Sequence, residues 1–458
     1  MKKYAPKLDP GFRPIGVELD DYVARAKKAG KHEITICVER NDGYNYIYKV
    51  PAFKDNTGHD EETILLLERV VKTLLWLSGG YKVIINGSKV LAEELAKQYS
   101  YGGKRDFDTH FMERVYEQKF EVRYERCKRK LVEHKEVIEV QGDLSGHRIG
   151  FDAGGSDRKV SAVIDGKTVF ATETVWNPKT NSNPQYHYDG IVDSFNQAKK
   201  HLNGRVDAVG ISSAGIYINK KAMVASLFIQ VGEEDFKKHV KDIYIRAVKD
   251  TFGDIPFTVA NDGDVAALAG ARGLKDNGVL GIAMGTSEAV GYVDLNGNLR
   301  GYLSELAFVP VDLNPKAMVD EWSGDYGCGV KYFSQDGVIK LAEDNGFKFE
   351  KGLTPAQKLK VIQKLNDEGD EFAAQIFTDI GIYLAYTLAY YAKFYEIKHV
   401  LLMGRVVSGK GGEQITNTCN KVFKEEYPHL AHITVALPDE ATRRVGQSET
   451  AASMPSTK

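Results

Sequence analysis

The chain has little cysteine: four residues in 458, Cys37, Cys127, Cys328 and Cys419, and no two of them lie close together in the sequence. No CxxC pair is present. Paired cysteines at short spacing are the usual mark of small disulfide frameworks, so their absence argues against one. We therefore expect free thiols and a reducing, cytoplasmic location.

Excess charge of one sign is also missing, because 61 Lys and Arg residues face 63 Asp and Glu residues. A net charge of −2 gives no general attraction to nucleic acid or to an anionic membrane. The most apolar long stretch, residues 372–395, is interrupted by Asp379 and Lys393 and predicts a buried helix. The N-terminus has no apolar core, so we expect no signal peptide. The sequence favours a soluble protein without nucleic-acid or membrane partners.

Hydrophobic residues make up 43% of the chain, which is enough for large cores. Strand-like runs alternate with helical runs, which predicts the α/β class. Residues 1–140 read as a small α/β unit with a hairpin at Asn41-Asp42-Gly43 and a helix over 61–78 that stops at Gly79. We predict three parts: residues 1–140, 146–258 and 259–458.

Two similar strand–turn–strand units, residues 148–166 and 280–298, contain glycine-rich turns. Consecutive backbone N–H groups in such a turn can bind an anion, and a hydroxyl adds a donor. The predicted phosphate-binding residues are Gly154, Gly155, Ser156, Gly285, Thr286 and Ser287. Asp152 accepts hydrogen bonds only when ionised, so it suits a hydrated Mg²⁺ shared with phosphates. The alternative for either turn alone is a tight hairpin without a ligand.

A third glycine-rich turn, residues 404–412, follows the strand-like "HVLLM" and nearly spells a P-loop. Gly411 stands after Lys410 where a P-loop needs a hydroxyl, so a P-loop enzyme is disfavoured. No GxGxxG opens a strand-to-helix turn, which argues against a dinucleotide-binding Rossmann site.

Six segments in order resemble the actin-like ATPase superfamily, most closely its ROK and hexokinase-like sugar kinases. They are "GFDAGGSDRKVSAVIDG", "DAVGISSAGI", "FTVANDGDVAALAGARGL", "GIAMGTSEAVGYVDLNG", "SELAFVPVD" and "HVLLMGRVVSGKGG", spread over residues 147–450. The resemblance implies a two-lobed actin-like, ribonuclease H-like fold that binds ATP and Mg²⁺. Residues 146–258 would form the first lobe and 259–458 the second, with a C-terminal helix returning to the first. Residues 1–140 would be an accessory region.

The resemblance also implies roles for single residues. Asp262 would be the general base that accepts a proton from a sugar or polyol hydroxyl. Asn261 and Glu305 would bind substrate hydroxyls, and Gly404 with Arg405 would contact adenosine. The alternative for Asp262 is a helix N-cap, with Asn261 and Asp264 as rival caps.

The chain departs from the family pattern at three points. Phe308 stands where ROK members usually have a histidine, Cys328 is alone where they have a zinc-binding cysteine cluster, and Ser287 replaces a glycine. We therefore expect no zinc. The acidic–aromatic segment Asp320-Glu321-Trp322 has two interpretations, part of a sugar site or a capped surface loop, and we favour the surface loop. We interpret His187 as a loop residue.

The leading hypothesis is an ATP-dependent carbohydrate kinase. A non-catalytic sugar sensor and an ATPase without a sugar acceptor are the alternatives. ROK repressors carry an N-terminal helix-turn-helix, and the mixed α/β pattern of residues 1–140 argues against it. The substrate and the oligomeric state stay open, with a homodimer as one option.

Overall fold

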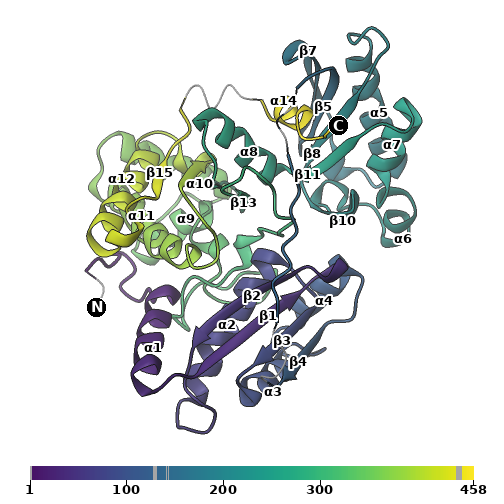
Figure 1. The fold of residues 1–458 in the computed structure, drawn as a ribbon. Helices are drawn as coiled ribbons and strands as arrows, with labels where there is room; N and C mark the ends of the chain where they lie inside the picture. The colour runs from purple at the N-terminus through teal and green to yellow at the C-terminus, as the bar shows by residue number, and fades with distance from the viewer. Residues whose placement is uncertain (1–2, 127–130, 141, 143, 440–445, 458) are drawn as a thin grey trace. The chain divides into compact units, whose positions relative to one another are not determined.

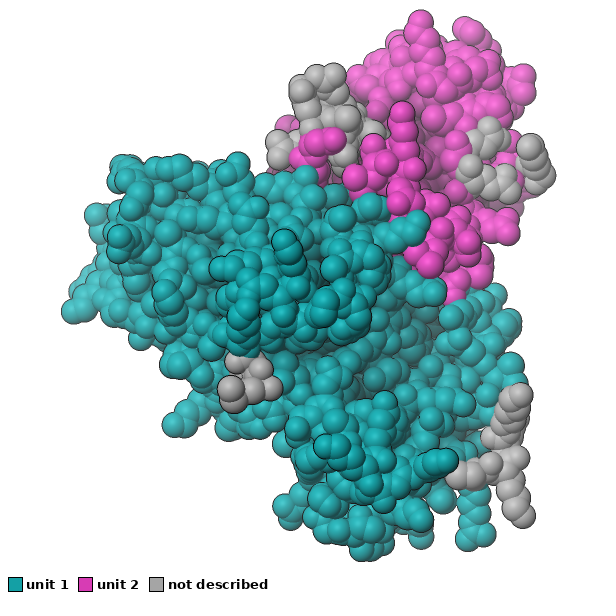
Figure 2. Space-filling model, turned by 60° about the vertical axis from the view of Figure 1, so that its left-hand side comes forward, with its two compact units in different colours: residues 1–136, 282–290, 302–437 teal, residues 137–281, 291–301, 438–458 magenta. Residues whose placement is uncertain are grey.

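The computed structural model describes residues 3–126, 131–140, 142, 144–439 and 446–457. The chain divides into two compact units (Figure 2). Unit 1 comprises residues 1–136, 282–290 and 302–437, and unit 2 comprises residues 137–281, 291–301 and 438–458. The predicted division into residues 1–140, 146–258 and 259–458 stays a prediction.

The first part of unit 1 is built around a four-stranded sheet with strand order β2-β1-β3-β4 (Figure 1). The predicted hairpin joins β1 and β2, which pair antiparallel. Asp42 and Gly43 both have positive φ, 60° and 74°, which Asp-Gly tolerates in a tight turn. The elements are α1 (Ile15–Ala29), β1 (Glu33–Glu39), β2 (Asn45–Pro51), α2 (Asp60–Ser78), β3 (Lys82–Asn86), α3 (Lys89–Gln98), α4 (Asp106–Tyr116) and β4 (Glu121–Glu125).

Helix α2 is the buried helix of this part. Every residue from Leu66 to Ser78 is buried, including the charged Glu68, Arg69 and Lys72. A helix that is buried on all sides must pair its charges internally, because an unpaired buried charge is strongly destabilising. Gly79, with φ 80°, ends the helix at the residue that the sequence predicts.

The rest of unit 1 contains a helical layer and most of a second sheet. Its helices are α9 (Gln335–Asp344), α10 (Pro355–Asp367), α11 (Glu371–Tyr391) and α12 (Lys410–Glu426). The sheet has the order β13-β12-β14-β15, with β12 (Val279–Met284), β13 (Glu288–Val293), β14 (His399–Met403) and β15 (Thr434–Ala436). Among the described residues, α11 alone is long and apolar enough to cross a membrane by length and composition, and most of it is buried. Its burial is that of a core helix, as predicted.

Unit 2 contains a five-stranded sheet with the order β11-β8-β5-β6-β7. Strands β5, β8 and β11 are parallel, whereas β5, β6 and β7 are antiparallel. The strands are β5 (His147–Ala153), β6 (Asp157–Ile164), β7 (Lys167–Val175), β8 (Ala208–Ser213) and β11 (Phe257–Asn261), with a separate hairpin of β9 (Ile216–Ile218) and β10 (Lys221–Val224). The helices are α5 (Pro184–Lys199), α6 (Glu233–Asp235), α7 (Ile243–Phe252), α8 (Asp262–Leu274) and α14 (Gln447–Ala452).

The C-terminal helix α14 packs directly on the backbones of β5 and β8 (Figure 1). A Cβ at Gly150 would lie 1.6 Å from the carbonyl oxygen of Ser448, and a Cβ at Gly210 would lie 1.6 Å from that of Ala451. Only glycine permits so close an approach of helix to strand. Gly150 and Gly210 therefore allow α14 to pack directly on the backbones of β5 and β8.

Candidate functional site

The candidate site of unit 2 lies at the carboxyl ends of three neighbouring parallel strands. Asp152 of β5 pairs in register with Ser212 of β8, and Ser213 of β8 pairs with Asn261 of β11. Asp262 follows directly as the first residue of α8. Ligands of open α/β sheets bind at this edge, because polar ends of several strands meet there.

Asp152 is a buried carboxylate that accepts a hydrogen bond from a neighbouring serine. It is 4% exposed, and its Oδ1 accepts a hydrogen bond of 2.6 Å from the Ser212 hydroxyl. Burial raises the pKa of Asp152 to about 6, and the charge of Asp262 adds to the rise. A nearby cation would reverse this rise.

These features fit a magnesium ion held mainly by water and phosphate. Mg²⁺ in phosphoryl-transfer sites uses one or two carboxylates and keeps several waters. Among the described residues, no group of three or more His, Cys, Asp or Glu side chains is placed to hold a metal. Asp152 is therefore the residue that would hold the ion, with the remaining ligands supplied by water and nucleotide.

The turn after β5, residues 154–156, contains two glycines, and the surroundings of the two positions differ. A Cβ at Gly154 would lie 2.8 Å from the carbonyl oxygen of Asp157, so the hairpin itself requires glycine there. A Cβ at Gly155 would meet only the Lys179 side chain, at 3.0 Å from Cε and 3.2 Å from Nζ. Ser156 donates its hydroxyl to Asp157 Oδ2 at 3.0 Å. The tight hairpin alone explains why residue 154 is glycine. It does not explain Gly155, where a side chain would meet only Lys179.

Asn261, and not Asp262, is the N-cap of α8. The Asn261 Oδ1 accepts from the Gly263 N–H at 2.7 Å, and its Nδ2 donates to the Gly215 carbonyl at 2.7 Å. The alternative reading of Asp262 as the cap is therefore wrong, because the preceding residue already fills that position. One amide hydrogen of Asn261 is left for a substrate hydroxyl.

Asp262 is half-buried at the start of α8, where it also accepts from the Gly263 N–H at 3.0 Å. Burial raises the pKa of Asp262, whereas that N–H and the charge of Lys179 oppose the rise. Its neighbour Asp264 accepts from the Tyr292 N–H at 3.1 Å, and burial raises the pKa of Asp264 to about 7. A carboxylate with a raised pKa is better suited to accept a proton near neutral pH.

In unit 1 the predicted phosphate turn and the predicted adenosine turn lie on neighbouring strands, β12 and β14. Gly404 has φ 94°, and a Cβ there would lie 2.4 Å from the Met284 carbonyl oxygen. Gly285 donates its N–H to the Ser287 carbonyl at 3.0 Å, while Thr286 and Ser287 are exposed. The structure thus brings residues 285–287 and Gly404-Arg405 together within one unit.

The near-match to a P-loop has a packing explanation. A Cβ at Gly411 would lie 2.7 Å from the Phe377 ring of α11, so α12 begins close to that helix because Gly411 has no side chain. The Lys410 ammonium donates to the Asp367 carbonyl at 2.5 Å. Gly411 therefore allows α12 to pack on α11, and Lys410 binds a carbonyl at the end of α10.

Glu305 lies in a segment that is fixed to the end of α2. Ser304 and Glu305 donate their N–H groups to Leu77 and Trp76 at 2.9 and 3.0 Å. Ser304 has φ 51°, a costly conformation for a residue with a side chain. The strained segment precedes the short 3-10 helix η5 (Leu306–Phe308).

A second carboxyl group, Glu288 of β13, faces Glu305. Glu288 is 4% exposed, and neither of its carboxyl oxygens has a hydrogen-bond partner among the described residues. Burial raises the pKa of Glu288 to about 8, and the charge of Glu305 adds to it. The raised pKa favours the protonated form of Glu288 near neutral pH. The one signal of Glu288 in the sequence is an acid directly after the Gly-Thr-Ser turn, and it was not predicted as a site residue.

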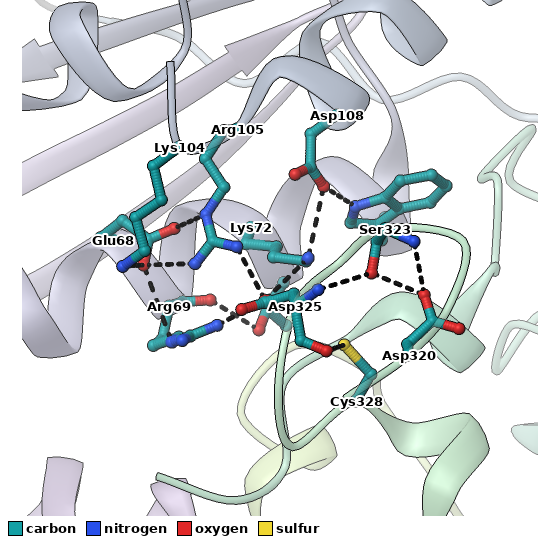
Figure 3. A network of polar contacts seen from close by, with 12 residues as sticks. Glu68, Arg69, Lys72, Lys104, Arg105, Asp108, Asp320, Ser323, Asp325 and Cys328 are labelled. Carbon is teal, nitrogen blue, oxygen red and sulfur yellow. Dashed lines mark hydrogen bonds and ion pairs between the residues drawn. The ribbon is translucent and has the colours of Figure 1, made fainter. Parts of the chain in front are cut away.

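The segment 320–328 contributes to a buried ion-pair network with α2 and α4 (Figure 3). Asp325 accepts from Arg69 and Lys72 at 2.5 and 2.8 Å and pairs with Arg105 at 2.8 Å. Burial alone would raise the pKa of Asp325, but Lys72, Arg69 and Arg105 outweigh it and hold the pKa far below its usual range. The network also includes Glu68, Lys104, Asp108, Asp320, Ser323 and Cys328.

The prediction of a surface loop at Asp320-Glu321-Trp322 is therefore wrong for Asp320, which is 3% exposed and accepts from the Ser323 hydroxyl at 2.6 Å. Glu321 and Trp322 are exposed. The cations that bury this segment come from residues more than 200 positions away, which no local pattern reveals.

Two of the three positions that differ from the family pattern are Phe308, which lies among aromatic rings, and Cys328, which is buried. The Phe308 ring packs against Trp76, Phe107 and Phe111, with centroid distances of 4.2, 5.6 and 6.5 Å. Cys328 is a buried free thiol, and burial raises its pKa to about 11. A neutral thiol is a poor metal ligand. The absence of zinc stays a prediction.

His187 lies in α5 and is buried, so its interpretation as a loop residue is wrong. Asn183 caps α5 and Pro184 begins it, and these start the helix earlier than the apolar pattern indicates. Cys37 and Cys419 are also free thiols, and Cys127 lies outside the described residues.

Comparison with protein families gives one match: the model of the ROK family matches residues 148–437. A ROK hexokinase from Thermus thermophilus is similar in structure, with a TM-score of 0.51 and 16% identity over 68% of this chain and 97% of that one. A ROK transcriptional regulator, described as a homologue of the E. coli MLC protein, has a TM-score of 0.50 and 14% identity, over 68% of this chain and 79% of that one. A search of curated sequences finds no match. The predicted α/β, two-lobed actin-like fold is confirmed.

Proposed function

Because the chain belongs to the ROK family, we propose that it is an ATP-dependent kinase that transfers the γ-phosphoryl group to a hydroxyl of a sugar or polyol. The observation that carries this proposal is the strand edge of unit 2. There Asp152 and Asp262 lie within electrostatic reach of each other, beside the glycine turn of residues 154–156. A carboxylate suited to Mg²⁺ next to one suited to accept a proton is what phosphoryl transfer to an alcohol requires.

In the proposed mechanism Asp262 accepts the proton of the attacking hydroxyl. Its raised pKa brings its basicity closer to neutral pH, and the N–H groups at the α8 N-terminus and the charge of Lys179 oppose the rise. Asn261 holds the start of α8 and offers its remaining amide hydrogen to the substrate. Asp152 would hold Mg²⁺ through water, and the ion would supply positive charge to the phosphates.

The remaining assignments stay predictions. The N–H groups and hydroxyls of residues 154–156 and 285–287 are proposed for the phosphates, Gly404 and Arg405 for adenosine, and Glu305 for a substrate hydroxyl. That both turns serve one nucleotide is a prediction from the sequence. The proposal includes a cytoplasmic protein without nucleic-acid or membrane partners and leaves a homodimer open.

ROK members also include regulators, so catalysis has to be tested directly. We propose measuring ADP release from Mg·ATP by the full chain, with and without a panel of hexoses, hexosamines and polyols. Carbohydrate-dependent release that is lost in Asp262→Asn supports the kinase. Carbohydrate binding without ADP release indicates a sensor, and release that no carbohydrate changes indicates an ATPase. Either result refutes the kinase.

A further inference from the structure

The segment that follows β7 is bound to the glycine turn by two hydrogen bonds. Trp176 donates its backbone N–H to the Ser156 carbonyl at 3.1 Å and its Nε1–H to the Gly154 carbonyl at 2.8 Å. Trp176 and Pro178 are buried, and Pro178 begins the 3-10 helix η2 (Pro178–Thr180). The position of Lys179, in the middle of η2, is therefore fixed relative to the turn.

The Lys179 side chain extends over Gly155. Its Cε and Nζ lie 3.0 and 3.2 Å from where a Cβ of Gly155 would stand. The ammonium also acts on Asp262, whose pKa its charge lowers. Lys179 thus lies against the predicted phosphate turn and within electrostatic reach of the proposed base.

The ammonium of Lys179 has no carboxylate within ion-pair distance and no hydrogen bond among the described residues. Two other cations of this region, both on β6, are paired: Lys159 with Asp157 at 3.2 Å, and Arg158 with Asp193 at 2.6 Å. A surface lysine without a partner is common on its own. This one differs because its exposed side chain lies beside Gly155 of a glycine turn, where a phosphate is proposed to bind.

We propose that Lys179 is a catalytic residue that contacts the transferred γ-phosphoryl group, an inference that rests on the proposed kinase function. In the step, the substrate oxygen forms a bond to the γ-phosphorus while its proton passes to Asp262. The bond from the γ-phosphorus to the bridging oxygen breaks, and its electron pair leaves with ADP. Negative charge on the phosphoryl oxygens is stabilised by the Lys179 ammonium.

The test compares Lys179→Gln and Lys179→Arg with Lys167→Gln in the full chain. Lys167 is exposed and begins β7, at the opposite end of that strand from the segment that carries Lys179, so it is a control lysine. The first readout is the affinity for Mg·ATP and Mg·ADP by calorimetry, and the second is carbohydrate-dependent turnover. Melting temperatures of all variants check that the fold is kept.

We expect Lys179→Gln to weaken ATP about 10-fold while ADP affinity hardly changes, and to lower turnover roughly 10²–10³-fold. Lys179→Arg should recover part of both losses, and Lys167→Gln should match the wild type. Equal ATP and ADP affinities in wild type, or an unchanged ATP preference in Lys179→Gln, would overturn the inference. An ATP preference that depends on Lys179, without turnover of any carbohydrate, would support the contact and refute the kinase.

Discussion

Phe308 packs against the fully buried Trp76, with ring centroids 4.2 Å apart. An aromatic contact therefore occupies the position at which the family pattern has a histidine. The indole of Trp76 is held in turn by Asp108, which accepts its N–H. The contact joins η5 to α2, so the segment that carries Glu305 depends on residues from the first part of the chain.

From this contact we predict that Phe308→His does not create a zinc site. The histidine would face the rings of Trp76, Phe107 and Phe111, and it would lose packing worth about 1–3 kcal/mol. Elemental analysis of untagged wild type and variant should show less than stoichiometric zinc, and the variant should melt at a lower temperature. Stoichiometric zinc in either protein would contradict the prediction.

The ion-pair network predicts a large effect at Asp325. Asp325→Asn removes the charge shared by Arg69, Lys72 and Arg105, and breaking such a buried pair costs about 3–5 kcal/mol. Urea unfolding should show this loss, whereas Glu321→Gln, which alters an exposed carboxylate, should change stability by less than about 1 kcal/mol.

The same network predicts how the contribution of Asp325 to the free energy of unfolding changes with pH. The folded-state pKa of Asp325 lies below its unfolded value, so its contribution is fully present above about pH 4 and is lost as the pH falls further. The difference in unfolding free energy between wild type and Asp325→Asn should therefore shrink below pH 4. A difference that is constant from pH 7 to pH 3 would contradict this reading.

Two adjacent residues separate capping from catalysis. Asn261→Ala removes the cap of α8 and should cost about 1 kcal/mol. Asp262→Asn should leave the melting temperature nearly unchanged but lower carbohydrate-dependent turnover roughly 10²–10⁴-fold, because the proton acceptor is gone. Wild-type turnover in Asp262→Asn would remove the main support for a general base.

Glu288 predicts the opposite pH behaviour to Asp325. Its folded-state pKa, about 8, lies above the unfolded value, so stability falls as the pH rises from about 4.5 to 8. Glu288→Gln removes this cost, and its melting temperature should exceed that of wild type by roughly 2 °C or more at pH 8.5. The gain should vanish near pH 4.5. No gain at pH 8.5 would show that the carboxyl group has partners that lower its pKa.

The sequence was informative where a local rule decides the structure. The Asp-Gly hairpin, the stop of α2 at Gly79 and the burial of α11 follow from spacing and turn chemistry. The two-lobed fold was predicted from the resemblance of six motifs to a known family. Prediction failed for Asp320 and His187, because their burial depends on long-range packing and on an earlier helix start. Glu288 and Lys179 were not predicted as site residues for a similar reason. The tertiary fold brings Glu288 near Glu305 and Lys179 near Gly155, and no local sequence pattern indicates either proximity.

The chain passes from one compact unit to the other five times, after residues 136, 281, 290, 301 and 437. Residues 1–136 and 302–437 share one unit, joined by the Asp325 ion pairs and the Trp76–Phe308 contact. A fragment that begins near residue 137 would keep the residues matched by the ROK family model. It would lack Arg69, Lys72 and Arg105, the three cations that pair with Asp325, and it would expose apolar surface that residues 1–136 cover. Shortening the protein to its family core should therefore yield an aggregating polypeptide rather than a minimal enzyme.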